Sequence, residues 1–133
     1  MSEMSNYLEN ALLDHVLNNT SLTSPTTVWL ALFTADPGET GSLTNEVTTT
    51  GTAYARQVAS FGAASSGTST SDADIEFPQA TASYGTVSHV GIMDNATAGA
   101  GNMLFYTSLT TSKAIDSGDI FKVTSTNLTV TLD

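Results

Sequence analysis

The sequence predicts a mainly β fold, a single β-sandwich or small barrel-like domain of about seven short antiparallel strands with one N-terminal α-helix. Ser and Thr make up roughly three residues in ten, and β-branched Thr suits a pleated surface. Short apolar runs alternate with Gly, Pro, Asn and Asp turn signals, and helical periodicity is confined to the N-terminus. No repeat or composition shift divides the chain. We therefore expect one domain over residues 1–133, with an arm and helix over 1–20 and a β-rich body over 26–133.

The helix is predicted over residues 6–18. Its apolar positions follow the 3.6-residue period: Leu8, Ala11, Leu12, Val16 and Leu17. Asn6 followed by Glu9 suggests a variant of the capping box. A helix of this length is marginal on its own in water, so its apolar stripe must pack on something. The sequence leaves two partners open, the sheet of the same chain and a neighbouring subunit.

The predicted strands cover residues 26–34, 52–61, 74–77, 86–93, 103–109, 120–123 and 128–132. The first is apolar on both faces, which is typical of a central strand covered on both sides. The last alternates apolar residues with Thr, as expected for a half-buried strand. A turn at Asp36-Pro37-Gly38 opens a polar loop to about residue 50, and the Gly/Ser/Thr-rich residues 62–71 are expected to form a flexible loop.

The charge balance limits the partners that the chain can bind. Three basic residues against thirteen acidic ones give a formal net charge of −10. Such a surface repels nucleic acid and anionic membranes, so neither is expected as a partner. The chain has no cysteine, which excludes disulfides and thiolate sites. No apolar run is long enough to span a membrane and no secretory signal is recognisable, so synthesis in a cytoplasm is expected.

No residue pattern points to catalysis, a cofactor or a metal ion. Asp72, Asp74 and Glu76 alternate, but the following Gly and distal Glu of a calcium loop are missing, so a solvated strand face is expected. His89 lacks any nucleophile motif or metal-ligand spacing. Ser88 is adjacent to it, but neighbours on a strand are expected to point to opposite faces. The chain is therefore expected to be no enzyme.

Arg56 is the only arginine in the chain. A lone arginine commonly makes a bidentate ion pair with a carboxylate, either inside its own domain or across an interface. Both alternatives remain open from the sequence. The residues expected to contact a partner are Tyr7, Leu8, Leu12, His15 and Arg56.

Nearly the whole chain resembles a family of small virion structural proteins of tailed bacteriophages. The resemblance is carried by SNYLENALLDHVLNNT (5–20), TTVWLALFTADPGETG (26–41), AYARQVASFGAASSG (53–67), VSHVGIMDNATAGAGNMLFYTSLTTSKAIDSGD (87–119) and the terminal LTVTLD. It implies a β-sandwich-like body and a multicopy role without catalysis, and it transfers no functional residue.

Relatives in this family are labelled either tail-fibre-like or capsid decoration proteins. From the resemblance and the absence of catalytic motifs, we expect a capsid decoration (cement) protein, made in the host bacterial cytoplasm and located on the capsid surface. Such a protein is expected to form a homotrimer, to bind the outer surface of the major capsid protein and to need no cofactor. The alternative is a tail or fibre-associated virion protein with a role in tail assembly or host attachment.

Overall fold

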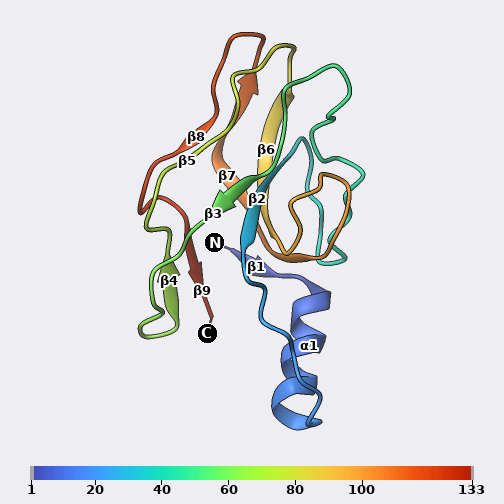
Figure 1. Ribbon diagram of the computed structural model, residues 1–133, viewed down its shortest axis with the longest axis vertical. Helices are drawn as coiled ribbons and strands as arrows, with labels where there is room; N and C mark the ends of the chain where they lie inside the picture. Colours follow the sequence, from blue (N-terminus) through green and yellow to red (C-terminus); the bar gives the residue numbers. More distant parts are fainter. Residues whose placement is uncertain (1, 133) are drawn as a thin grey trace.

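The computed structural model describes residues 2–132, which form a mainly β, sandwich-like body and one helix that projects from it (Figure 1). The elements are β1 (Glu3–Met4), α1 (Asn6–Leu17), β2 (Val28–Phe33), β3 (Gln57–Ala59), β4 (Thr68–Thr70), β5 (Ile75–Glu76), β6 (Gly85–Met93), β7 (Met103–Ile115), β8 (Lys122–Val123) and β9 (Thr129–Thr131). The predicted fold class is confirmed. All strand pairs are antiparallel, and the sheets do not close into a barrel.

The main sheet has the strand order β1-β7-β6-β2-β3. β2 pairs with β6 through Leu30 opposite Ile92, and with β3 through Trp29 opposite Val58. The last four residues of β2 are buried, because the strand has neighbours on both sides and cover on both faces. This confirms the central strand that the doubly apolar pattern predicts.

Two short ribbons, β4-β9 and β5-β8, lie beside the main sheet and help to enclose the core (Figure 1). Aromatic rings join these layers. The Phe77 ring stacks against Tyr54 with centroids 6.1 Å apart and meets the edge of Phe121 at 5.7 Å. Phe77 is only 1% exposed, so it occupies the centre of the core that both layers share.

Several features of the strand pattern differ from the prediction, including β7, which extends to Ile115 instead of ending at residue 109. β3 is much shorter than residues 52–61, because Tyr54 and Arg56 turn inward from an irregular segment before it. The predicted loop 62–71 contains β4, which pairs with the C-terminal β9 through Ser69 opposite Val130. β1 was not predicted, since two residues carry no recognisable period; it pairs with β7 through Met4 opposite Phe105.

The N-cap of the helix lies one residue before the position that the sequence predicted. Ser5, rather than Asn6, is the N-cap, and its Oγ accepts a hydrogen bond from the Leu8 N–H at 3.3 Å. Because the cap is Ser5, Glu9 lies one residue beyond the capping-box position, and the predicted box was wrong. The helical span itself is confirmed to within one residue at its C-terminal end.

Candidate functional site

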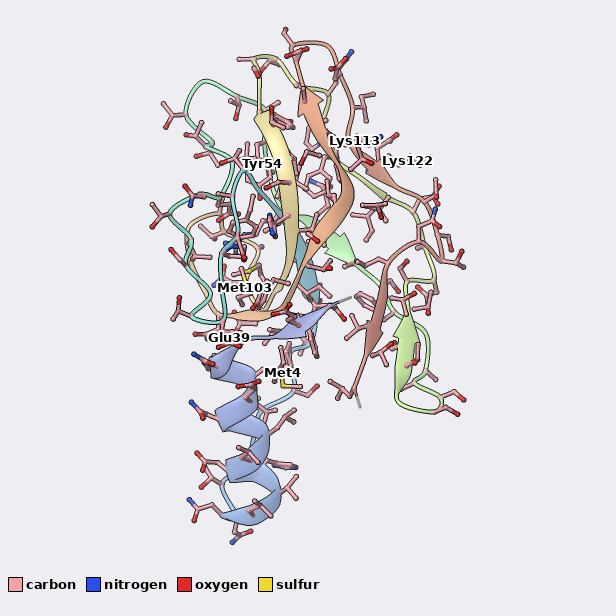
Figure 2. All side chains as sticks on the ribbon, turned by 180° about the vertical axis from the view of Figure 1, so that it is seen from behind. Met4, Glu39, Tyr54, Met103, Lys113 and Lys122 are labelled. Atoms are coloured by element: carbon pink, nitrogen blue, oxygen red, sulfur yellow. The ribbon has the colours of Figure 1, made fainter. Side chains whose placement is uncertain are left out.

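The first turn of α1 is fixed to the body by backbone and side-chain bonds. The Ser5 N–H donates to the Leu104 carbonyl at 2.9 Å, and the Asn6 N–H donates to the Glu39 carbonyl at 2.8 Å. The buried Ser5 hydroxyl also donates to the Met103 carbonyl. Figure 2 shows Met4, Glu39 and Met103 gathered where the helix leaves the body. The base of the helix is therefore held rigidly by three polar contacts.

Beyond this base the helix extends away from the sheet (Figure 1). Leu13, Val16 and Leu17 are 57%, 73% and 78% exposed, respectively. Their spacing of three and four residues places them on one face of the helix. We call these three residues the apolar stripe of α1. Three exposed aliphatic side chains close together form an apolar patch, whereas exposed apolar residues scattered singly are normal on protein surfaces.

The α1 residues that were expected to contact a partner differ in how far they are buried. Leu8 is 8% exposed and packs in the core of the chain itself, so its surface is not available to a partner. Leu12 is half-buried against that core, whereas Tyr7 is 43% exposed. His15 is exposed, and its Nδ1 accepts a hydrogen bond from the Leu22 N–H at 3.1 Å. This bond ties the returning segment to the helix.

The apolar residues that the sequence placed on one face of the helix therefore have two different environments. Leu8 and Leu12 pack on the body, as the intrachain alternative required, whereas Val16 and Leu17 are exposed. Leu13 was missed because it lies outside the 3.6-residue row that starts at Leu8. Leu13 is three and four residues before Val16 and Leu17, and this spacing could have identified it as their neighbour on the helix surface.

Arg56 is buried and makes four hydrogen bonds inside the chain. Its Nε and Nη2 donate to the two Glu46 carboxylate oxygens at 2.7 and 2.8 Å. Its Nη1 donates to the carbonyls of Asn95 and Ala100, both at 2.8 Å. The intrachain alternative for Arg56 is therefore the one found. Only 3% of Arg56 is exposed, which leaves little of its surface for the expected contact with a partner; its hydrogen bonds join two long loops.

Glu46 has further donors around its carboxylate. The Gly99 N–H donates to Oε2 at 2.8 Å and the Tyr54 hydroxyl donates to Oε1 at 2.7 Å. The Tyr54 oxygen in turn accepts the Leu32 N–H of the central strand at 3.1 Å. A chain of hydrogen bonds thus connects β2 with the loop that contains Asn95 and Ala100. We call these groups the Arg56–Glu46 network.

The network predicts a loss of stability in alkali. Burial, reinforced by the Glu46 charge, raises the pKa of Tyr54 well above its ordinary value of 10.0. The unfolded chain loses this phenolic proton above pH 10 while the folded chain keeps it, so folding stability should fall as pH rises past 10. The difference in tyrosinate absorbance between the unmodified chain and Tyr54→Phe should show Tyr54 ionising only with unfolding, and Tyr54→Phe should weaken the alkaline loss of stability. Ionisation of Tyr54 in the folded state near its ordinary pKa would contradict this.

The acidic residues considered for calcium do not converge. Asp74 accepts the Ser125 N–H at 2.7 Å and lies 3.2 Å from the Lys122 Nζ. The hydrogen bond from the Ser125 N–H and, to a smaller extent, the contact with Lys122 lower the pKa of Asp74 below its ordinary value. Among residues 2–132 no three His, Cys, Asp or Glu side chains are grouped so that they could hold a metal ion. Over the same residues, no helix has the length and apolarity needed to cross a membrane.

Ser88 and His89 do meet, contrary to the expectation. Ser88 Oγ lies 2.8 Å from His89 Nδ1, because the pairing of β6 with β7 is irregular between Val87 and His89 and the regular pleat is lost there. The opposite ring nitrogen, Nε2, is 4.0 Å from Asp36 Oδ1, beyond hydrogen-bonding distance. The serine–histidine contact is thus a local bond at a strand irregularity, with an exposed carboxylate nearby.

Comparison of the sequence with known protein families identifies the family of this chain. Residues 3–131 match the family described as Podophage GP4 fiber I protein gp80. The chain belongs to this family. The match extends from β1 to β9, so the family covers both the projecting helix and the β-rich body. A search of curated proteins found no match.

Membership of the gp80 family confirms the resemblance that the sequence suggested. The chain is a small structural protein of the phage virion. The apolar stripe of α1 is exposed at the surface, whereas the Arg56–Glu46 network joins two loops inside the body.

Proposed function

We propose that the chain is a fibre-associated subunit of the virion and that α1 attaches it to the next virion protein. The family's description, which names a fibre protein, favours this alternative over capsid decoration. The observation that carries the attachment role is the exposure of Leu13, Val16 and Leu17 on a helix whose base is fixed. A rigid base with an apolar outer face suits a helix that lies in a partner's groove.

The energetics of burial support this assignment. Covering the three aliphatic side chains contributes about 1.5–3 kcal/mol for each one that becomes fully buried. This binding free energy is modest for a single contact between two subunits, but repeated copies in a symmetric assembly add avidity. A role without catalysis is part of the proposal. The homotrimer and the contact with the major capsid protein remain predictions.

The proposal predicts that α1 is needed for incorporation but not for folding. A triple variant, Leu13→Gln, Val16→Gln and Leu17→Gln, should keep the melting temperature of the isolated protein, because exposed substitutions change stability by only about 0.5 kcal/mol each. Phage carrying this variant should contain little or none of the protein, as measured by quantitative mass spectrometry of purified virions. The cause is loss of the apolar contact with the neighbouring protein.

Val58→Gln is the matched control, because Val58 is a 50% exposed aliphatic residue on the body. It should be incorporated normally. Wild-type incorporation of the triple variant would overturn the attachment role. The copy number of the unmodified protein separates the two virion locations: a number that matches the tail supports the fibre, and a number that matches the shell subunits supports decoration.

A further inference from the structure

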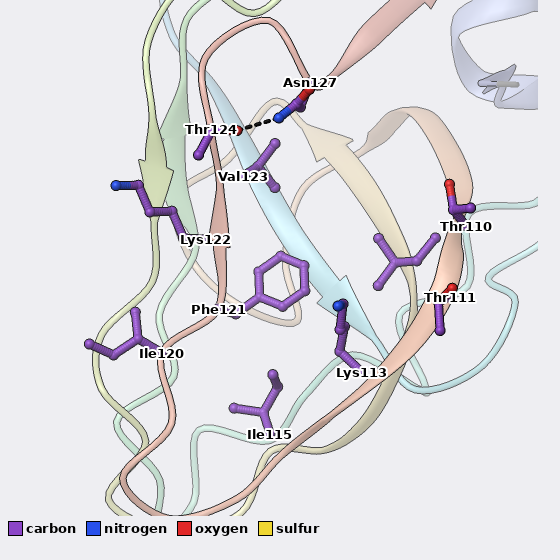
Figure 3. A pocket seen from close by; sticks show the side chains of 11 residues that line it. Thr110, Thr111, Lys113, Ile115, Ile120, Phe121, Lys122, Val123, Thr124 and Asn127 are labelled. Atoms are coloured by element: carbon purple, nitrogen blue, oxygen red, sulfur yellow. Dashed lines mark hydrogen bonds between the residues drawn. The ribbon is translucent and has the colours of Figure 1, made fainter.

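A hollow of about 480 Å³ lies between β7 and the segment around β8 (Figure 3). Its floor is apolar: Leu109, Ile115, Phe121 and Val123. Its rim is polar apart from Ile120: Thr110, Thr111, Lys113, Lys122, Thr124 and Asn127. The volume is within the usual range for small-molecule sites. An apolar floor below a rim of hydroxyls, an amide and ammonium groups suits a ligand with the same two-sided chemistry.

The hollow is produced by a large bulge in β7. Val87 of β6 pairs with Lys113, and His89 pairs with Ser108. One residue of β6 therefore lies opposite four residues of β7, at positions 109–112. In a bulge the extra residues leave the ladder and their side chains are redirected. Here the redirected segment supplies Thr110 and Thr111 to the rim, which a regular strand would not do.

The charges around the hollow are distinctive for this chain. Of the three Lys and Arg side chains in the sequence, Arg56 is buried against Glu46, and the other two line this hollow. Lys122 is paired with Asp74 at 3.2 Å, and Figure 3 shows its ammonium directed away from the hollow. Lys113 points into the hollow in the same view. Among residues 2–132, no carboxylate lies within ion-pairing distance of Lys113.

We propose that this hollow binds an acidic sugar unit, with the sugar carboxylate on the Lys113 ammonium. Sugar hydroxyls both donate and accept, which matches the hydroxyls of Thr110 and Thr111 and the Asn127 amide. The C–H face of a sugar ring fits the apolar floor that contains Phe121. A single carboxylate fits better than a dianion such as phosphate, because the net charge of −10 repels more highly charged ligands.

This inference does not depend on the proposed fibre role, because binding is measured on the isolated full chain. We would titrate ¹⁵N-labelled protein with glucuronate and follow the amide resonances. Shifts should concentrate at Thr110, Thr111, Lys113 and Phe121 and should diminish at high salt. Glucose, which has the same ring without the carboxylate, should bind about tenfold more weakly, as expected when one charge-assisted hydrogen bond is lost.

Two substitutions with the same charge change provide the critical comparison. Lys113→Gln should weaken glucuronate binding about tenfold and leave the weak glucose binding unchanged. Lys122→Gln removes the same charge from the same rim but should change binding far less, since that ammonium is already paired. Thr111→Val, a near-isosteric loss of one hydroxyl, should weaken both sugars.

Three results would overturn the proposal. The first is the absence of localised shifts with glucuronate. The second is an equal loss of affinity in Lys113→Gln and Lys122→Gln, which would indicate a general charge effect. The third is tighter binding of a short glutamate-rich peptide than of glucuronate at equal concentration, which would assign the hollow to a protein segment.

Discussion

Replacing Arg56 with methionine should lower the free energy of unfolding by about 3–5 kcal/mol, because it leaves the Glu46 carboxylate in the interior without its cation. The carbonyls of Asn95 and Ala100 lose their donor as well. The loss is a large fraction of the 5–15 kcal/mol typical of a whole domain. Urea denaturation followed by circular dichroism measures it. The two loops joined by Arg56 should also exchange their amide hydrogens faster.

Lys122→Met is the natural control for this prediction. It removes a cation from an exposed ion pair with Asp74 and should change stability far less than the buried substitution. A second comparison uses Arg56→Met combined with Glu46→Leu. Because the double variant leaves no unpaired carboxylate, it should cost less than the sum of the two single substitutions. Equal effects of Arg56→Met and Lys122→Met would show that the network contributes little.

Replacing Phe77 with alanine should lower the free energy of unfolding by about 3–5 kcal/mol. Phe77 is 1% exposed and touches the rings of Tyr54 and Phe121. Its removal opens a cavity at the junction of the main sheet and the β5-β8 ribbon. The melting temperature, measured by calorimetry, should therefore fall by roughly 10–25 °C.

Phe77→Leu separates the volume effect from a general sensitivity of the position. It keeps an apolar side chain in the cavity and should cost substantially less than alanine. Val58→Ala provides the exposed comparison, since half of the Val58 side chain is in solvent. Similar melting temperatures for Phe77→Ala and Val58→Ala would mean that the two layers do not depend on this ring.

Much of the strand pattern was predictable because local periodicity reports which face is buried. The central strand β2 and the half-buried β9 are the clearest cases, with four consecutive buried residues in β2 and a buried Val130 between exposed threonines in β9. Elements without a local period were not predictable. β1 has two residues, and β4 exists because β9, far away in the sequence, provides its hydrogen-bonding partner.

The candidate site was predictable only in outline. The amphipathic pattern identified α1 as the element whose apolar residues need cover, and part of them pack on the body of the same chain. Which of these residues are buried depends on how the cap at Ser5 fixes the helix on the body. Leu8 therefore became core, and Leu13 became surface. The hollow beside Lys113 was not predicted, because bulges depend on the register between two strands rather than on either strand alone.

The sequence by itself determined the β-rich composition, the single helix, the strong negative charge and the membership of a phage virion family. These properties follow from local residue preferences and from summed charge. Only the tertiary structure decided which groups the few cationic side chains pair with and which apolar residues of the helix are exposed. Arg56 was equally suited to an internal pair or an interface, and Glu46 brought it inside. A side chain's partner depends on contacts between distant segments, which no local pattern contains.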